Sequence, residues 1–248
     1  NKKEVLTELP DKIEQNMILP FNDEEEKIYV ANLAKANKEL QELYDIEGSD
    51  KMQILKLLTR LRQLCLEPRL VYDNIDQPSS KLKACMELIK TMQENKQKIL
   101  LFSSFTSVLD LIAEECQKAG ITYYMLTGST NKEERRELVS RFQKDDTTVF
   151  LISLKAGGTG LNLTSAENVI HYDPWWNVSA QNQATDRAYR IGQKNNVQVF
   201  NLVMKDSVEE KIIEMQKRKK ELADMFVENN SGGLSQMSKE DILSLFTM

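Results

Sequence analysis

Two arginines three residues apart, Arg187 and Arg190, carry the clearest potential for chemistry in this sequence. They lie in the segment QNQATDRAYRIGQ, whose pattern predicts a helix that ends at Gly192 with Arg190 in its final turn. Residues three apart project from one face of a helix, and two guanidinium groups held on one face suit the capture of phosphate oxygens. Composition alone also allows a solvated helix face on which an arginine pairs with Asp186.

A glycine-rich segment, SLKAGGTGLNL (Ser153–Leu163), follows the apolar run TTVFLIS. Its glycines, Gly157, Gly158 and Gly160, allow backbone N–H groups to approach a phosphate or another chain closely. The segment is not a dinucleotide fingerprint, because Leu163 stands where the third glycine or alanine belongs, and the sequence contains no GxxxxGKS or GxxxxGKT phosphate loop. A tight turn is the alternative, although the carboxyl end of a strand is where open α/β sheets bind ligands.

Further polar and aromatic side chains follow other apolar runs. In YDPWWNV, one of Trp175 and Trp176 is expected to pack while the other stays available for stacking or for a partner, unless both are partly buried under the next helix. The single histidine, His171, has no partnered nucleophile, so we assign it no catalytic role. Hydroxyl side chains that could cap helices or donate to backbone phosphates are Ser103, Ser104, Thr127 and Ser129.

The elements that must position these residues alternate between two types. Short β-branched or aromatic runs with polar or glycine ends predict buried strands at KILLFS, ITYYMLTG, TTVFLIS, ENVIHYD and VQVFNLVM. Helices are predicted at Ser79–Gln93, Thr106–Ala119, Asn131–Phe142 and Ser179–Arg190. This alternation predicts an α/β fold in which a parallel sheet carries helices on both faces.

Helical regions flank this predicted α/β region. Apolar residues recur at helical spacing from Asp23 to Leu70, and NIDQPSS then forms a linker. After Asp206 a long helix is predicted, followed by NNSGG and by LSQMSKEDILSLF, in which Ser238 and Asp241 resemble a capping box. We therefore predict a helical subdomain with its linker at 1–78, an α/β domain at 79–206, and a pair of further helices at 207–248.

Composition excludes several classes of protein. The chain has 248 residues, 41% hydrophobic and 29% charged, and lacks an apolar run that resembles a signal peptide or a membrane span. With one histidine and three distant cysteines (Cys65, Cys85 and Cys116), a Cys/His zinc site is excluded, and reduced, buried thiols in an intracellular protein are expected. The net charge of −5 lies entirely within residues 1–78, so a local cationic groove on the neutral remainder is still possible.

In this order and spacing, the segments resemble a known family. FSSF, LTGSTNKEERRELVSRF, LISLKAGGTGLNLTSAENVIHYDPWWN and QATDRAYRIGQ resemble motifs IV, IVa, V and VI of superfamily-two helicase-like ATPases. The DPWWN and DRAYRIGQ versions resemble the SWI/SNF translocases of double-stranded DNA. LTELPDKIEQNMILPFNDEEEKIYV and LRQLCLEPRL are similar to that family's helical protrusion, and SVEEKIIEMQKRKKEL to its brace helix, so the resemblance covers nearly the whole chain.

The resemblance implies a RecA-like lobe of the P-loop NTPase type. The family has two such lobes and carries its phosphate loop and magnesium-binding Asp-Glu motif on the first, whereas this sequence is similar to the second. ATP with Mg²⁺ would be held mainly by the first lobe, no metal would be held by this chain, and the chain alone would be inactive as an ATPase.

On the ATP side, the resemblance implies that Arg187 and Arg190 are arginine fingers that reach the γ-phosphate and stabilise the charge of the transition state. Other residues would position that helix or would line the cleft between the lobes and relay its closure: Gln183, Asp186, Gly158 and Gly160.

On the DNA side, the resemblance implies contacts to the phosphates of one strand. Residues matched to such contacts are Ser104, Thr127, Gly128 and Lys155, with Arg135 as a weaker candidate. Trp176 would lie near the DNA and couple the lobes. One departure is Val178, which stands where the family usually has proline, so the loop should be slightly freer with no chemical group lost.

The leading prediction is thus the second motor lobe of an ATP-dependent duplex-DNA translocase, partnered by double-stranded DNA and by its own first lobe. The alternative is a non-catalytic module that recruits protein partners through its acidic helical region; a dinucleotide-dependent enzyme is disfavoured by the failed glycine fingerprint. No membrane association is expected. We expect a cytoplasmic, nucleoid-associated protein if it is bacterial and a nuclear one if it is eukaryotic, and the compact spacing without a basic tail favours a bacterium.

Overall fold

The computed structural model describes residues 10–45, 51–157, 161–190, 192–225 and 239–247. These residues fold into two compact units, which we describe separately. The sheet unit comprises residues 84–202 together with the chain up to Met17, and the helical unit comprises 18–83 together with 203–248.

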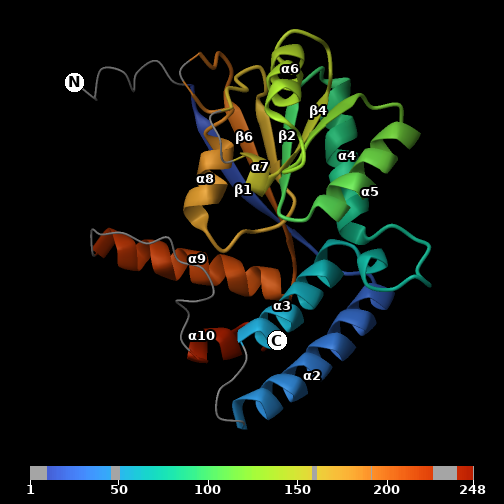
Figure 1. The fold of residues 1–248 in the computed structure, drawn as a ribbon, viewed down its shortest axis with the longest axis vertical. Helices are drawn as coiled ribbons and strands as arrows, with labels where there is room; N and C mark the ends of the chain where they lie inside the picture. The colour runs from blue at the N-terminus through green and yellow to red at the C-terminus, as the bar shows by residue number, and fades with distance from the viewer. Residues whose placement is uncertain (1–9, 46–50, 158–160, 191, 226–238, 248) are drawn as a thin grey trace. The chain divides into compact units, whose positions relative to one another are not determined.

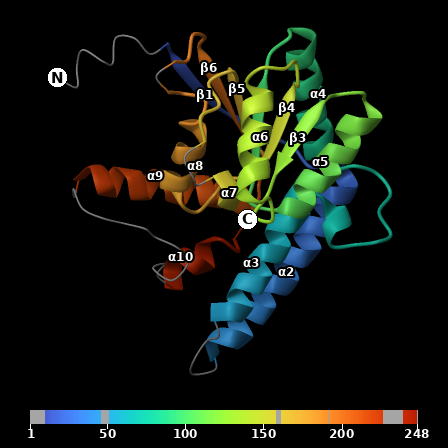
Figure 2. The ribbon, with the colours of Figure 1, turned by 45° about the horizontal axis from the view of Figure 1, so that its top comes forward.

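A six-stranded sheet forms the centre of the sheet unit, and its strands are ordered β1-β6-β5-β2-β4-β3 (Figure 2). The strands are β1 (Lys12–Leu19), β2 (Ile99–Ser103), β3 (Tyr123–Leu126), β4 (Val149–Ser153), β5 (Asn168–His171) and β6 (Val197–Met204). The pairs from β6 to β3 are parallel. The Asp11–Val197 and Leu19–Lys205 backbone hydrogen bonds show that β1 runs the same way as β6. The predicted parallel α/β fold is confirmed.

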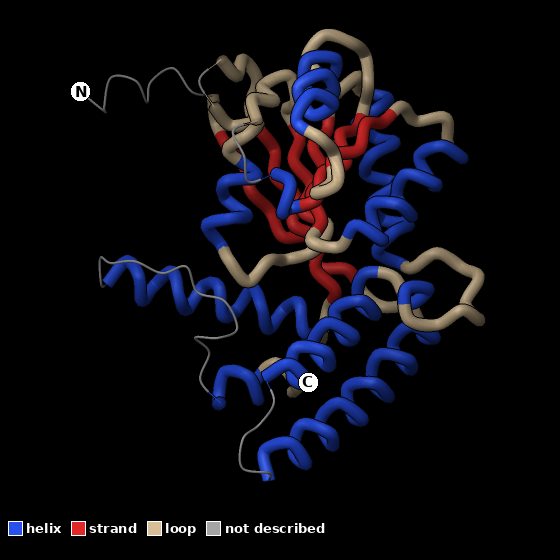
Figure 3. The backbone as a smooth tube through the Cα atoms, viewed as in Figure 1, coloured by secondary structure: helices blue, strands red, loops and turns tan. Residues whose placement is uncertain are grey.

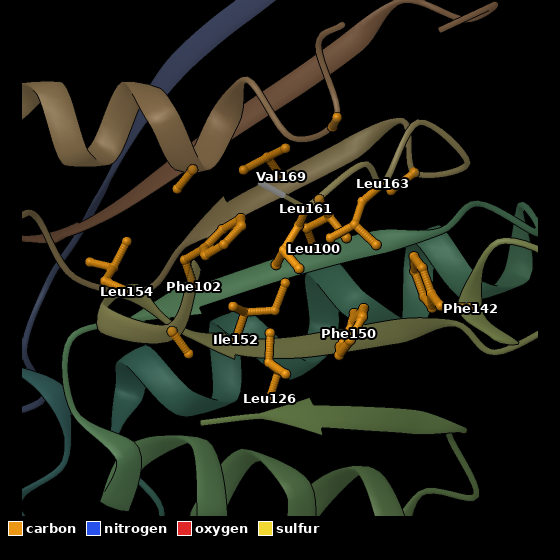
Figure 4. Close-up of a cluster of buried hydrophobic side chains, with 14 of the residues drawn as sticks. Leu100, Phe102, Leu126, Phe142, Phe150, Ile152, Leu154, Leu161, Leu163 and Val169 are labelled. Carbon is orange, nitrogen blue, oxygen red and sulfur yellow. The ribbon is translucent and has the colours of Figure 1, made fainter. Parts of the chain in front are cut away.

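Helices cover both faces of the sheet. The helices α4 (Ser80–Glu94) and α5 (Thr106–Lys118) lie on one face, and α6 (Lys132–Phe142), α7 (Leu154–Gly157) and α8 (Val178–Thr185) lie on the other (Figure 1). Under α6 to α8, a buried cluster gathers side chains from five strands, including Leu100, Phe102, Leu126, Phe150, Ile152 and Val169 (Figure 4). The intervening Leu101 and Leu151 are also fully buried, so apolar residues face both layers of helices.

The first strand differs from what the sequence predicts. Residues Lys12–Leu19 lie in the segment assigned to a helical protrusion, but they form the edge strand β1. Most of its side chains are exposed on both faces, with Ile13 at 55% and Ile18 at 47% exposure, so the sequence lacks the alternation that marks a half-buried strand. Backbone pairing with β6, a contact distant in sequence, determines its conformation.

The helical unit contains the predicted helices of residues 23–70. These are α2 (Asp23–Asp45), α3 (Lys51–Leu66) and the short 3₁₀ helix η2 (Pro68–Leu70), with α2 and α3 side by side (Figure 3). The later helices α9 (Val208–Met225) and α10 (Lys239–Ser244) belong to the same unit. The two units therefore do not coincide with the three segments 1–78, 79–206 and 207–248, whose status as separate domains stays a prediction.

A buried ion pair ties α9 to the first turn of α4 within the helical unit. Lys81 donates from Nζ to both carboxylate oxygens of Glu209 at 2.7 Å, and both side chains are 0% exposed. Glu209 also accepts the Met204 N–H at 2.8 Å, and the Tyr29 hydroxyl accepts the Val208 N–H at 2.7 Å. The turn into α9 is thus fixed by side chains far from it in sequence.

Other expectations concern single residues. Cys65, Cys85 and Cys116 are all buried thiols, as predicted, and burial raises the pKa of the Cys116 thiol to about 12. The capping-box prediction falls partly on Ser238, which lies outside the described residues. Within the part of the chain that the structure describes, no helix is both long and apolar enough to cross a membrane.

Candidate functional site

Three predicted DNA contacts follow three neighbouring strands. Ser104 follows β2, Lys155 lies two residues after β4, and Thr127 directly follows β3. The register pairs Ser103 with Ser153 in β2 and β4, and Leu126 with Ile152 in β3 and β4. Adjacent strands lie about 4.8 Å apart, so these residues share the carboxyl edge of the sheet. Lys155 is exposed there.

A tight turn carries Thr127 and Gly128 into α6. Thr127 and Thr130 bond to each other twice: the Thr127 N–H donates to the Thr130 hydroxyl at 3.1 Å, and the Thr130 N–H donates to the Thr127 carbonyl at 3.3 Å. The N-cap of α6 is Asn131, whose Oδ1 accepts the N–H groups of Glu133 and Glu134. The hydroxyls of Thr127 and Ser129 are therefore not the helix cap, and they lie 2.8 Å apart beside the exposed Gly128.

Ser104 differs from the other predicted DNA contacts, because its hydroxyl donates to the carboxylate of Asp173. The same carboxylate accepts the Ser104 N–H at 3.0 Å and the Ser103 hydroxyl at 2.7 Å, and Asp173 is 1% exposed. A hydroxyl has one proton, so Ser104 cannot donate to a phosphate while it donates to Asp173. Sequence reasoning assigned no role to Asp173, although its position after a strand end could have marked it.

Arg135 lines an open cavity of about 760 Å³ between α6 and the segment that follows the glycine-rich loop. Its NH1 donates to the Ala156 carbonyl at 3.0 Å. The cavity is lined by Thr130, Lys132, Arg135, Arg136, Val139, Ser140, Leu161 and Asn162. This set contains three cations and no acidic residue, so the cavity suits an anionic ligand.

The two arginines do not lie on a helix, which corrects the predicted helix through Arg190. The helix α8 ends at Thr185 with Asp186 as its C-cap, and turns follow. After the C-cap, the N–H groups of Arg187 and Ala188 donate to the carbonyls three residues back, Ala184 at 3.2 Å and Thr185 at 3.1 Å, so the regular α-helix is not continued. Beyond this point the Arg187 carbonyl accepts the Leu163 N–H at 3.0 Å, and the Ala188 carbonyl accepts the Gln193 side chain at 3.1 Å.

Arg187 is half-buried and Arg190 is exposed. The Arg187 Nε is buried without a hydrogen-bond partner, and no carboxylate lies within 4 Å of either guanidinium in the described ranges. Desolvation, reinforced by the positive charge of Arg190, lowers the pKa of Arg187, while Asp186 acts in the opposite direction. The alternative of an arginine–Asp186 ion pair is therefore wrong for this structure. Gln183 and Asp186 are both exposed beside the turn.

A buried polar network, which sequence reasoning missed, fixes α8 to the sheet. Gln181 accepts the Trp175 N–H at 3.2 Å and donates to Asn201 at 3.0 Å. At the end of α8, the Thr185 hydroxyl lies 2.9 Å from the His171 Nε2. The Gln181–Asn201 contact joins α8 to β6 across 20 residues, and no local pattern marks such a pair.

The tryptophans match one of the two arrangements predicted for them, and Val178 begins a helix. Trp175 and Trp176 are both partly buried, as in the alternative in which neither stays fully available, and Trp175 packs against the buried cluster of the sheet unit. Val178 is the first residue of α8, after the N-cap Asn177. Because proline is favoured at the first helical position, a proline there would suit the same backbone. Gly158 and Gly160 lie outside the described residues.

A comparison of sequences and structures supplies the family. The model of the helicase conserved C-terminal domain matches residues 80–192. The double-stranded-DNA complex of the Sulfolobus solfataricus SWI2/SNF2 ATPase core aligns with a TM-score of 0.77 and 30% identity, over 98% of this chain and 52% of that one. The chain is a C-terminal lobe of the SWI/SNF type, in helicase superfamily two.

Curated relatives of this C-terminal lobe are much longer proteins. A Mycoplasma pneumoniae protein described as an uncharacterized ATP-dependent helicase is 37% identical over 99% of this chain and 24% of its own length. The ISWI chromatin-remodeling complex ATPase ISW1 of Saccharomyces cerevisiae is 33% identical over 98% of this chain and 23% of its own length. The C-terminal lobe thus spans about a quarter of the length of these relatives.

Acid should destabilise this C-terminal lobe through His171. Burial lowers the pKa of His171 to about 4, with the charge of Lys12 acting in the same direction and those of Glu14 and Asp173 opposing it. Between pH 6.5 and 4 the unfolded chain therefore binds a proton that the folded chain does not. The free energy of unfolding should fall by up to about 3 kcal/mol as the pH decreases through this window. Above pH 6.5 His171 causes no such loss of stability.

Urea unfolding at pH 7, 6 and 5 measures this effect, with His171→Gln as the matched variant. Because the chain has one histidine, the variant should show a shallower loss of stability with acid than the parent. Equal losses in both proteins, or an imidazole that titrates near pH 6.5 by NMR in the folded state, would contradict the prediction.

Proposed function

We propose that this chain is the second motor lobe of an ATP-driven translocase of double-stranded DNA. The observation that carries the proposal is the half-buried Arg187, whose buried Nε has no partner among the described residues. A buried polar group without a partner is unfavourable, and a cation in that position is stabilised by an incoming anion. The phosphate chain of ATP, presented by a first lobe that also binds Mg²⁺, supplies that anion.

In this proposal, Arg187 and Arg190 stabilise the charge that develops on the transferred phosphoryl group. Arginine fingers contribute about 10³ to 10⁵ in rate where they have been measured. Gln183 and Asp186 are exposed beside the turn and are available to position it against the first lobe. The proposal assigns Gly158 and Gly160, which lie outside the described residues, to the cleft between the lobes, and it assigns the metal to the first lobe.

DNA contacts are proposed for the carboxyl edge of the sheet and for the adjoining α6. Lys155 supplies a positive charge, and Thr127 and Gly128 present a hydroxyl and a backbone N–H. Arg135 extends the contact toward the basic cavity, and Trp176 lies beside the DNA. Ser104 contacts the DNA only in a conformation in which its hydroxyl no longer donates to Asp173. The likeness to a SWI2/SNF2 core solved with double-stranded DNA supports this assignment.

ATP hydrolysis by this chain tests the proposal, measured with and without duplex DNA and again after the separately prepared first lobe is added. We expect no turnover by the chain alone and DNA-stimulated turnover on mixing. Turnover by the chain alone, dependent on Arg190, would reveal a complete ATP site and overturn the half-site assignment.

A salt titration of DNA binding completes the test. Phosphate contacts predict that the logarithm of affinity falls linearly with the logarithm of salt concentration, with a slope of about −0.9 per contact. No DNA binding at low salt would instead favour a protein-interaction module, for which the acidic first turn of α2, Asp23 to Glu26, is the candidate surface.

A further inference from the structure

The C-terminal end of α6 is joined to the segment after the glycine-rich loop by one side chain. Gln143, the C-cap of α6, donates from Nε2 to the Asn162 carbonyl at 2.6 Å and accepts the Ser165 N–H on Oε1 at 3.0 Å. A side-chain amide that donates to one backbone group and accepts from another fixes both in position and orientation. Segment 162–165 therefore follows any displacement of this end of α6.

The same segment is bonded directly to the arginine turn. The Leu163 N–H donates to the Arg187 carbonyl at 3.0 Å, and Leu163 is 0% exposed in the buried cluster that also contains Ala188. Close packing prevents Leu163 from shifting independently of its neighbours. A displacement of segment 162–165 consequently displaces the backbone that carries the Arg187 guanidinium.

The other end of α6 carries the basic side chains. Arg135 lines the cavity together with Lys132 and Arg136 and donates to the Ala156 carbonyl at 3.0 Å. Lys132 and Arg136 are exposed, and neither forms an ion pair with another described residue. An anion bound here acts on the first turns of α6, while Gln143 acts on the opposite end of the same short helix.

We propose that Gln143 is a positioning residue that conveys DNA contact on α6 to Arg187, so that DNA binding sets the arginine for ATP hydrolysis. The route runs from the basic face of α6 through Gln143 to segment 162–165 and from Leu163 to Arg187, and each step is a hydrogen bond or a covalent connection. This inference rests on the proposed function, because it names how one part of that site regulates another.

The experiment uses the full-length protein and measures kcat for ATP with and without duplex DNA, together with the Kd for DNA. Gln143→Ala should lower the ratio of DNA-stimulated to DNA-free kcat by about 2- to 30-fold, with the Kd for DNA changed less than about 2-fold. Gln143→Glu keeps the acceptor for Ser165 but places a carboxylate against the Asn162 carbonyl, so its ratio should fall at least as far. Gln198→Ala is the matched control, because Gln198 is an exposed glutamine of β6 whose side chain makes no hydrogen bond with described residues.

A double-variant cycle separates this role from a purely structural one. In an Arg135→Ala background, Gln143→Ala should have little further effect on the DNA-stimulation ratio, because both residues belong to one route. Unchanged ratios in both Gln143 variants, or equal losses with and without Arg135, would overturn the inference while leaving the proposed function intact. Absence of DNA-stimulated turnover in the unsubstituted protein would overturn both. Thermal unfolding of each variant identifies any that fails to fold. If one Gln143 variant does not fold, the DNA-stimulation ratio of the other Gln143 variant tests the inference.

Discussion

Replacing Arg187 by alanine in the full-length protein should lower kcat for DNA-stimulated ATP hydrolysis by about 10³-fold or more, and Arg190→Ala should have a similar effect. The physical reason is that a guanidinium helps most where negative charge develops during phosphoryl transfer. Because the proposed contacts to DNA lie on other segments, the Kd for DNA should stay nearly unchanged. Steady-state kinetics and a DNA-binding titration on the same preparations measure both quantities.

The comparison of kcat with KM makes this prediction specific. The first lobe is proposed to hold most of the nucleotide, so KM for ATP should change much less than kcat. Arg141→Ala is the matched control, because Arg141 is an exposed arginine of the same unit that pairs with Glu137 at 3.5 Å. Its kcat should match that of the unsubstituted protein. If both Arg187→Ala and Arg190→Ala retain kcat within tenfold, neither arginine acts as a finger.

Breaking the buried ion pair of Lys81 and Glu209 should lower the free energy of unfolding more than any other substitution that we propose. Lys81→Met leaves the Glu209 carboxylate buried without its cation, and removing one member of a buried ion pair lowers the free energy of unfolding by about 3–5 kcal/mol. Combining Lys81→Met with Glu209→Gln removes the uncompensated charge, so much of this loss should be recovered. Urea unfolding of the single and double variants measures the difference.

The exposed pair of Lys35 and Glu39 provides the comparison for this second prediction. Its charged atoms are 3.8 Å apart and its side chains are 75% and 43% exposed. Lys35→Met should change the free energy of unfolding by about 0.5 kcal/mol or less, since exposed pairs are screened by water. A loss below about 1 kcal/mol for Lys81→Met, or no recovery in the double variant, would show that the buried pair does not stabilise the helical unit.

Much of the sheet unit is predictable from local patterns. The runs ILLFS and VFLIS become β2 and β4 because apolar residues on both faces can only be buried between two layers of helices. The helix α6 begins at Lys132, one residue inside the predicted range, because Asn131 caps it. In such elements the local sequence and the global fold favour the same conformation.

Elements whose conformation depends on residues far away in the sequence cannot be predicted from local patterns. The strand β1 has no hydrophobic period and depends on pairing with β6. The turn after α8 carries the Arg187 carbonyl, which accepts the N–H of Leu163 from a segment distant in sequence. The commitment of the Ser104 hydroxyl to Asp173 spans 69 residues, so the motif that suggested a phosphate contact could not reveal it.

The path of the chain also constrains how this protein can be shortened. The chain passes between its two units near residues 17, 83 and 202, so neither unit is a continuous piece of sequence. A truncation that removes residues 1–78 deletes β1 together with α2 and α3, and Asn201 then loses its contacts with Glu14 and Asn16. It also converts β6 into a bare edge strand, which is prone to pair with another molecule. A soluble minimal version of this lobe must therefore retain Lys12–Leu19. This segment is distant in sequence from residues 84–202, but it forms part of the same sheet.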